Sequence, residues 1–86
     1  MPAQLTPEQI RMARAALKWG VRDLAKRTGL TANTISRLEN GSGAQVSTLQ
    51  KIVVAFEHAG IEFIDPNGGG PGVRLRKSDA AVRPKK

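Results

Sequence analysis

The sequence predicts a mainly α fold, in which four short helices precede a C-terminal β-hairpin and a basic tail. Up to about residue 59, apolar residues recur at the spacing of one helix face, between Thr, Ser and Gly residues that start and end helices. From residue 60 the apolar residues alternate with charged ones, as they do in strands. We therefore expect three parts, residues 1–59, 60–76 and 77–86, the last of them disordered.

The first helix is expected over residues 7–18. Thr6 supplies a hydroxyl cap, a proline follows at the first helical position, and Gln9 stands where it completes a capping box. Arg11 and Lys18 are expected to point mostly to water, and Trp19 to close the core rather than to stack on a base. The face that should be buried consists of Ile10, Ala13 and Leu17.

The next two helices are expected over residues 21–28 and 32–40, with Gly20 and Thr31 as their caps and Gly41 at the end. Two short helices that cross steeply can touch only if the first carries a small residue at the crossing, which Ala25 supplies. Gly29 can take the left-handed conformation that the turn requires. These residues predict a helix-turn-helix whose small core is formed by Leu24, Leu30, Ile35 and Leu38.

A fourth helix is expected to begin after a cap at Ser47, to reach about Ala59 and to stop at Gly60. Its apolar face is Leu49, Ile52, Val53 and Phe56. Beyond it, strand-like alternation on both sides of the loop DPNGGGPG predicts a β-hairpin. An isolated hairpin is only marginally stable, so it must pack on the helices or pair with a second copy. We expect pairing into a homodimer through Ile61, Phe63, Val73 and Leu75.

The third helix carries the residues with the clearest chemistry. Ile35 and Leu38 set its buried direction, and at roughly 100° per residue the polar side chains on the opposite side are Asn33, Ser36, Arg37 and Asn40. Arginine can bind guanine, asparagine adenine, and serine several bases or a phosphate, while Ala32 and Thr34 on the shoulders could touch a thymine methyl. The alternative is that these residues only form the solvated face of an amphipathic helix.

Composition narrows the classes of function. The 86 residues include no cysteine, which excludes disulfides, thiolate metal sites and cysteine nucleophiles. GGGPG lacks the Lys-Ser/Thr ending of a phosphate loop, and nothing resembles a nucleophile with its base. We expect no enzyme, no cofactor and no metal. The N-terminus has no signal-peptide pattern, and no apolar run approaches the roughly 20 residues that span a bilayer, so a cytoplasmic protein without membrane insertion is expected.

The formal net charge is +7, and residues 73–86 hold six of the 14 Lys and Arg residues against one acid. A basic tail favours an acidic partner, most often nucleic acid. The alternative is a terminus that only aids solubility.

Residues 6–59, and above all the segment LAKRTGLTANTISRLENG, resemble the Xre/Cro-type helix-turn-helix proteins, whose domain is that of the lambda-like phage repressors. The resemblance implies that Ala32, Asn33 and Arg37 touch base edges and that Asn40 meets the phosphate backbone. It also implies a scaffold salt bridge between Arg14 and Glu39.

The sequence departs from this family in two places. Many members begin the second helix with a phosphate-binding glutamine where this chain has Val21, and the loop after the ENG sequence carries no basic residue. Phosphate contacts are therefore expected from Arg22, Lys26, Thr31, Thr34 and Asn40, with help from the tail.

Together these features predict a transcription regulator that binds double-stranded DNA, a homodimer that represses at a palindromic operator with recognition helices roughly 34 Å apart. A first alternative is the antitoxin of a toxin–antitoxin pair, with the hairpin or tail covering a toxin. A second is a helix-turn-helix used only for protein interaction, or a basic protein on an anionic membrane surface.

Overall fold

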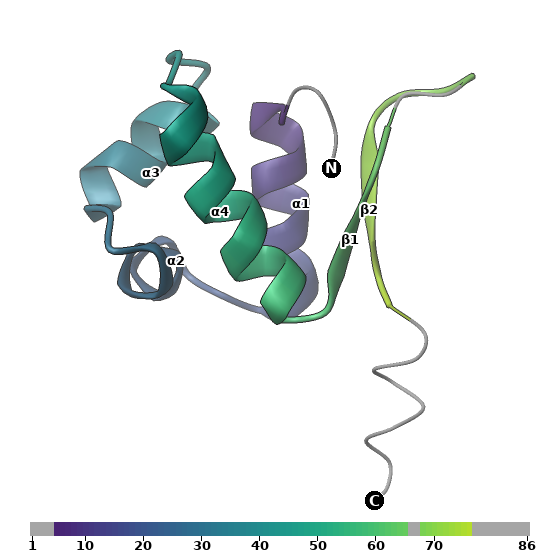
Figure 1. The fold of residues 1–86 in the computed structure, drawn as a ribbon, viewed down its shortest axis with the longest axis horizontal. Coiled ribbons are helices and arrows are strands. Elements are labelled where there is room, and N and C mark those ends of the chain that lie inside the picture. Colours follow the sequence, from purple (N-terminus) through teal and green to yellow (C-terminus); the bar gives the residue numbers. More distant parts are fainter. Residues whose placement is uncertain (1–4, 66–67, 77–86) are drawn as a thin grey trace, which may run out of the picture.

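The computed structural model describes residues 5–65 and 68–76. Over these residues the chain forms four helices and a two-stranded antiparallel sheet, which confirms the mainly α prediction (Figure 1). The elements are α1 (Pro7–Leu17), α2 (Val21–Thr28), α3 (Ala32–Glu39), α4 (Val46–His58), β1 (Ile61–Ile64) and β2 (Gly72–Leu75). The tail predicted to be disordered and two residues of the predicted hairpin loop lie outside the described residues.

One hydrophobic core joins all these parts. In Figure 1 the hairpin lies at one end, α2 and α3 at the other, and α1 and α4 between them. Trp19 stacks on Phe56 with ring centroids 5.6 Å apart, and Phe63 meets Phe56 edge-on at 6.0 Å, so Trp19 packs on the core as predicted. The buried cluster consists of Ile10, Ala13, Leu24, Ala25, Ile35, Leu38, Ile52, Phe56 and Ile61.

The start of α1 has the predicted capping box. The Gln9 backbone N–H donates to the Thr6 hydroxyl at 3.1 Å, and the Thr6 backbone N–H donates to the Gln9 side-chain oxygen at 3.0 Å. The buried Gln9 amide also donates to the carbonyls of Ile64 at 3.3 Å and Gly72 at 3.1 Å. This one side chain therefore ties the helix cap to both strands of the hairpin.

The end of α1 differs from the prediction by one residue. Lys18 is the C-cap rather than the last helical residue, and it takes the left-handed conformation with φ 59°. The N–H of Trp19 then reaches back to the carbonyl of Arg14 at 2.9 Å, which satisfies one of the last helical acceptors.

The helix-turn-helix forms as predicted. Ala25 is 9% exposed and belongs to the core, where a larger side chain would separate the helices. Gly29 has φ 78° and its N–H donates to the carbonyl of Ala25 at 2.9 Å, the left-handed C-cap that the sequence required. Helix α3 ends at Glu39, one residue before the predicted end, because Asn40 is its C-cap.

The predicted cap at Ser47 is wrong. Helix α4 starts at Val46, and its N-cap is Gln45, which makes no side-chain capping hydrogen bond. The N–H groups of Thr48 and Leu49 donate to the carbonyl of Gln45, each at 3.1 Å, so Ser47 already lies inside the first turn. A cap must stand before the first helical residue, with a non-helical backbone, and Ser47 no longer can.

The two strands are paired so that one face of the hairpin meets the helices. Ile61 lies opposite Leu75 and Phe63 opposite Val73, with Glu62 opposite Arg74 on the other face. Glu62 and Arg74 form an exposed ion pair at 2.9 Å. The hairpin thus packs on the helices of its own chain, one of the two ways in which the sequence allowed it to be stabilised.

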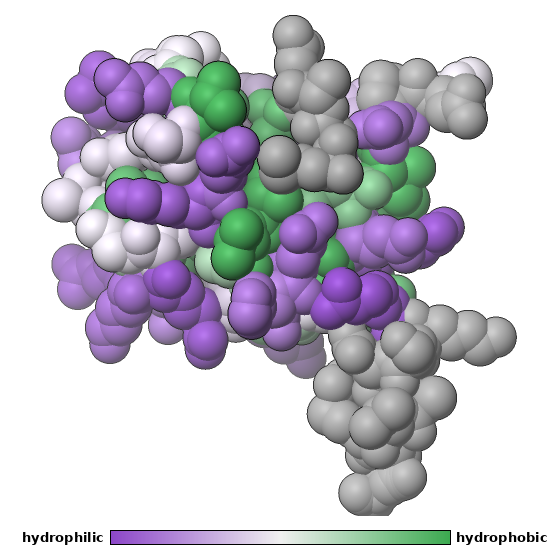
Figure 2. Space-filling model, viewed as in Figure 1, coloured by the Kyte–Doolittle hydropathy of each residue, from purple (hydrophilic) through white to green (hydrophobic). Residues whose placement is uncertain are grey.

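The view in Figure 2 shows a largely hydrophilic surface with hydrophobic patches over α4 and over the hairpin. Across the described residues, no helix has the length and the apolar character needed to cross a bilayer.

Candidate nucleic-acid interface

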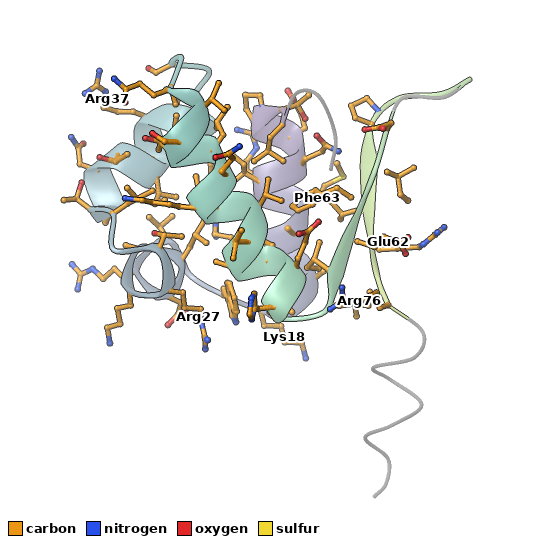
Figure 3. All side chains as sticks on the ribbon, in the orientation of Figure 1. Lys18, Arg27, Arg37, Glu62, Phe63 and Arg76 are labelled. Carbon is orange, nitrogen blue, oxygen red and sulfur yellow. The ribbon has the colours of Figure 1, made fainter. Side chains whose placement is uncertain are left out.

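The two faces of α3 differ as the sequence predicted. Ile35 is fully buried and Leu38 is 5% exposed, and both belong to the core. The residues that face solvent are Asn33, Ser36 and Arg37, with Ala32 and Thr34 half-buried on the shoulders. In Figure 3 Arg37 projects from α3 away from the other helices. The exposed face is therefore short, polar and basic.

The start of α3 is fixed by two threonines. Thr31 has an extended backbone, and its hydroxyl accepts the N–H of Thr34 at 3.1 Å. The two hydroxyl oxygens lie 2.9 Å apart. Whichever hydroxyl donates in this pair, the hydrogen of the other is left to donate to an outside acceptor. The predicted cap is confirmed, and it keeps a donor near the solvent side of α3.

The end of α3 is held by an ion pair with α1. The Arg14 guanidinium donates to both carboxylate oxygens of Glu39, from Nε at 2.6 Å and from Nη2 at 2.8 Å. Its third nitrogen donates to the carbonyl of Trp19 at 3.1 Å. The hydrogen bond to Glu39 raises the pKa of Arg14 above its ordinary value, although burial opposes the shift. This is the scaffold pair that the family resemblance implied.

A second arginine of α1 reinforces this contact. The Arg11 guanidinium donates to the backbone carbonyl of Glu39, and it lies 3.7 Å from the carboxylate of Glu8. The prediction that Arg11 points mostly to water therefore missed its role, although the side chain remains exposed. The sequence did contain a signal for this role. Arg11 lies three residues before Arg14, and residues three apart on a helix lie on neighbouring parts of one face. Two arginines thus hold α3 from one side.

The predicted phosphate contacts surround this face. Arg22 and Lys26 are both exposed and lie four residues apart, on one face of α2. Asn40 is exposed, and as the C-cap of α3 its N–H donates to the carbonyl of Ser36 at 3.1 Å. The carboxylate of Asp23, which could repel a phosphate, accepts the N–H of Gly20 at 2.8 Å. The region around α3 therefore offers cations and hydrogen-bond donors.

A shallow groove of about 180 Å³ runs beside Arg37, between α3 and the first turn of α4. It is lined by Thr34, Arg37, Leu38, residues 42–45 and Thr48. The structure thus brings Arg37 and Thr34 alongside the loop after the ENG sequence.

The residues predicted to form a dimer lie on the hairpin, but most of them face inward. Ile61 is fully buried in the core, and Phe63 and Val73 are partly buried against it. Leu75 is 53% exposed. Three of the four side chains therefore pack within the chain, and Leu75 alone of the four offers a large exposed surface.

In the part of the chain that the structure describes, no three His, Cys, Asp or Glu side chains gather as ligands for a metal ion.

A comparison with models of protein families matches residues 10–57 of the 86 to a family described as Helix-turn-helix. The matched region begins within α1 and ends within α4, so it contains α2 and α3 complete. A search of curated proteins found no match.

Proposed function

The chain belongs to the helix-turn-helix family of the Xre and lambda-repressor type, whose members are DNA-binding regulators, and from that premise we propose that it is a dimeric repressor of a palindromic operator. The observation that carries the proposal is the exposed polar face of α3, backed by a helix end that two arginines hold in place. A rigid helix with a free polar face fits the major groove of B-DNA.

The base contacts that this proposal assigns are those of α3. Arg37 is long enough and free enough to bind the O6 and N7 of a guanine together. Asn33 suits an adenine, Ser36 either a base or a phosphate, and Ala32 a thymine methyl. These contacts supply the sequence preference.

The phosphate contacts come from the surroundings of α3. Arg22 and Lys26 contribute charge, while the hydroxyl pair of Thr31 and Thr34 and the amide of Asn40 contribute hydrogen bonds. Such contacts fix the position of the protein on the duplex without reading sequence. They contribute affinity for DNA that decreases as the salt concentration rises.

A dimer is proposed because one copy reads too few base pairs for useful specificity. The two longer extents of the structure, 39 and 33 Å, are comparable to the roughly 34 Å between half-sites one helical turn apart. Because Ile61, Phe63 and Val73 pack inward, the dimer would use the backbone edge of a strand and Leu75. Repression needs only occupancy of the operator.

The test is selection of genomic fragments of the host by the purified chain at several salt concentrations, followed by sequencing of what stays bound. A short inverted repeat that survives high salt is the expected result. Fragments without a shared sequence, released steeply as salt rises, would refute an operator-specific repressor and leave a basic protein on a polyanion. A single half-site, recovered with one copy bound, would refute the dimer but keep the regulator.

A further inference from the structure

A groove with a volume of about 820 Å³ lies between the end of α2 and the outward face of α4. The residues proposed above to contact DNA do not line it. Its apolar part includes Val54, which is 50% exposed, and Ala55. Hydrophobic surface is visible over α4 in Figure 2. The lining residues are Arg27, Thr28, Ser47, Gln50, Lys51, Val54, Ala55, His58 and Ala59.

The titratable side chains that line the groove are all basic. Arg27 comes from α2, while Lys51 and His58 come from α4. The Arg27 guanidinium lies over the Trp19 ring, 4.3 Å from its centroid, and Trp19 in turn stacks on the core residue Phe56. The contact with Trp19 restrains the Arg27 side chain, which Figure 3 shows on α2 at the edge of the molecule. An apolar strip is thus bordered by positive charge.

We propose that this groove binds an acidic amphipathic helix of a partner protein. An apolar helix face laid into a groove between two helices is a common mode of recognition, and acidic residues beside that face would meet Arg27 and Lys51. A nucleic-acid backbone would satisfy the cations but has no apolar group to cover Val54. The proposal does not depend on the proposed operator or on repression.

None of the described helices is acidic, because each of them contains a single Asp or Glu residue. The C-terminal residues 77–86 are basic, so the cations of the groove would repel them. In a second copy, the carboxylates of Glu8, Glu39 and Glu62 already lie against Arg11, Arg14 and Arg74. Asp23 accepts the N–H of Gly20. We therefore assign the complementary charge to a partner protein.

The test is selection from a displayed library of helical peptides on the immobilised full chain. Each peptide has about 14 residues, near the length of α4, with leucines fixed on one face and every other position free to be Glu, Lys, Gln or Ala. We expect Glu to exceed Lys beside the leucine stripe. The best peptide, added to the ¹⁵N-labelled chain, should shift the amides of the groove.

Two charge reversals separate the groove from the general basic charge of the chain. Lys51→Glu should weaken the best peptide about two- to tenfold, since it replaces an attraction by a repulsion. Lys18→Glu changes the net charge equally at an exposed residue that does not line the groove, and it should leave the affinity within about twofold. Val54→Ser, at a half-exposed residue, should weaken binding without altering charge.

Three results would overturn the proposal. One is no excess of Glu over Lys among the selected peptides. Another is equal weakening by the two charge reversals, which would mean non-specific attraction. The third is a random-sequence DNA duplex that shifts the same groove amides and displaces the peptide, because the groove would then belong to the DNA interface.

Discussion

At the scale of single residues, the side chains of α3 divide between those that hold the helix and those that face solvent. Glu39 is 7% exposed and accepts two hydrogen bonds from Arg14, while its backbone carbonyl accepts one from Arg11. Arg37 is exposed, and it makes no contact that the core needs. A substitution at each of these positions should therefore fail in a different way.

Replacement Glu39→Gln should destabilise the fold by about 1 to 3 kcal/mol, because it leaves the guanidinium of Arg14 with a neutral partner in a partly buried site. Urea denaturation followed by circular dichroism measures the loss. Glu62→Gln is the matched control, since its ion pair with Arg74 is exposed. Equal shifts of the two denaturation midpoints would contradict a special role for Glu39.

Replacement Arg37→Ala should leave stability unchanged and cost about 1 to 3 kcal/mol of binding to the operator, with relaxed preference at one base pair. Fluorescence anisotropy with an operator duplex and its single-base variants provides the measurement. Lys18→Ala serves as the control because it also removes one exposed charge. If binding to scrambled DNA falls by the same factor, Arg37 contacts phosphate instead of a base.

Lys18→Gly should stabilise the chain by about 0.5 to 1 kcal/mol. Lys18 is a non-glycine residue at φ 59°, where a Cβ is strained and glycine is not. The gain is smaller than the strain itself, because glycine also raises the entropy of the unfolded chain. The measurement is the midpoint temperature of thermal unfolding of the two proteins. An unchanged or lowered midpoint in the glycine variant would show that contacts of the Lys18 side chain offset the backbone strain.

At the scale of elements, the hairpin carries its own ion pair across the strands. The Arg74 guanidinium, which donates to Glu62 at 2.9 Å, lowers the pKa of the Glu62 carboxyl below its ordinary value. A lowered pKa means that the pair favours folding above the unfolded pKa of about 4.5 and ceases to do so as the pH falls through the folded value. The contribution is small because both side chains are exposed.

An NMR titration of the side-chain carboxyl carbon should therefore give Glu62 a pKa below about 4.5. In Arg74→Gln that pKa should rise toward the ordinary value, because the hydrogen bond and the positive charge are both removed. A Glu62 pKa that is the same with and without Arg74 would mean that the pair does not persist in solution.

The elements also show what the sequence could and could not predict. Helix starts at Thr6, Gly20 and Thr31 were predictable because a cap and its helix lie within a few residues. The start of α4 was not, since Ser47 is a good cap by type and only the backbone at Gln45 decides against it. The residues on the exposed face of α3 were predictable from the α-helical period alone.

Contacts between distant parts of the chain were harder to predict. The alternation of apolar and charged residues predicted the two strands and their apolar face. It did not predict whether that face would pack on the helices of the same chain or on a second copy. Nor did local pattern reveal that the Gln9 amide reaches the carbonyls of Ile64 and Gly72. The Arg14–Glu39 pair was accessible only through the family resemblance, because nothing local joins residues 25 apart in sequence.

At the scale of the whole molecule, the charge is unevenly divided. The formal charge of the chain is +7, and residues 77–86 contain four Lys and Arg residues against one Asp. Arg22, Lys26 and Arg37 add a smaller set of cations around α3. Affinity for the DNA backbone is therefore expected to depend on both regions.

Removal of residues 77–86 should lower the affinity for operator and scrambled DNA by the same factor, because phosphate contacts carry no base information. The slope of log K against log salt should become shallower, by about 0.9 for each phosphate that the protein no longer neutralises. Binding isotherms at several salt concentrations measure this slope. An unchanged slope would show that the tail takes no part in DNA binding. The control is the circular dichroism spectrum, which should be the same for the truncated and the full chain if truncation leaves the fold intact.

The way α3 is anchored has a consequence for the evolution of this chain. Its attachment rests on Ile35, Leu38 and Glu39, whereas Asn33, Ser36 and Arg37 contribute little to folding. Random substitution at those three solvent-facing positions should therefore leave most variants folded, and new operators could be acquired by changing few codons. The same separation would let this domain serve as a scaffold for binders directed to chosen DNA sites.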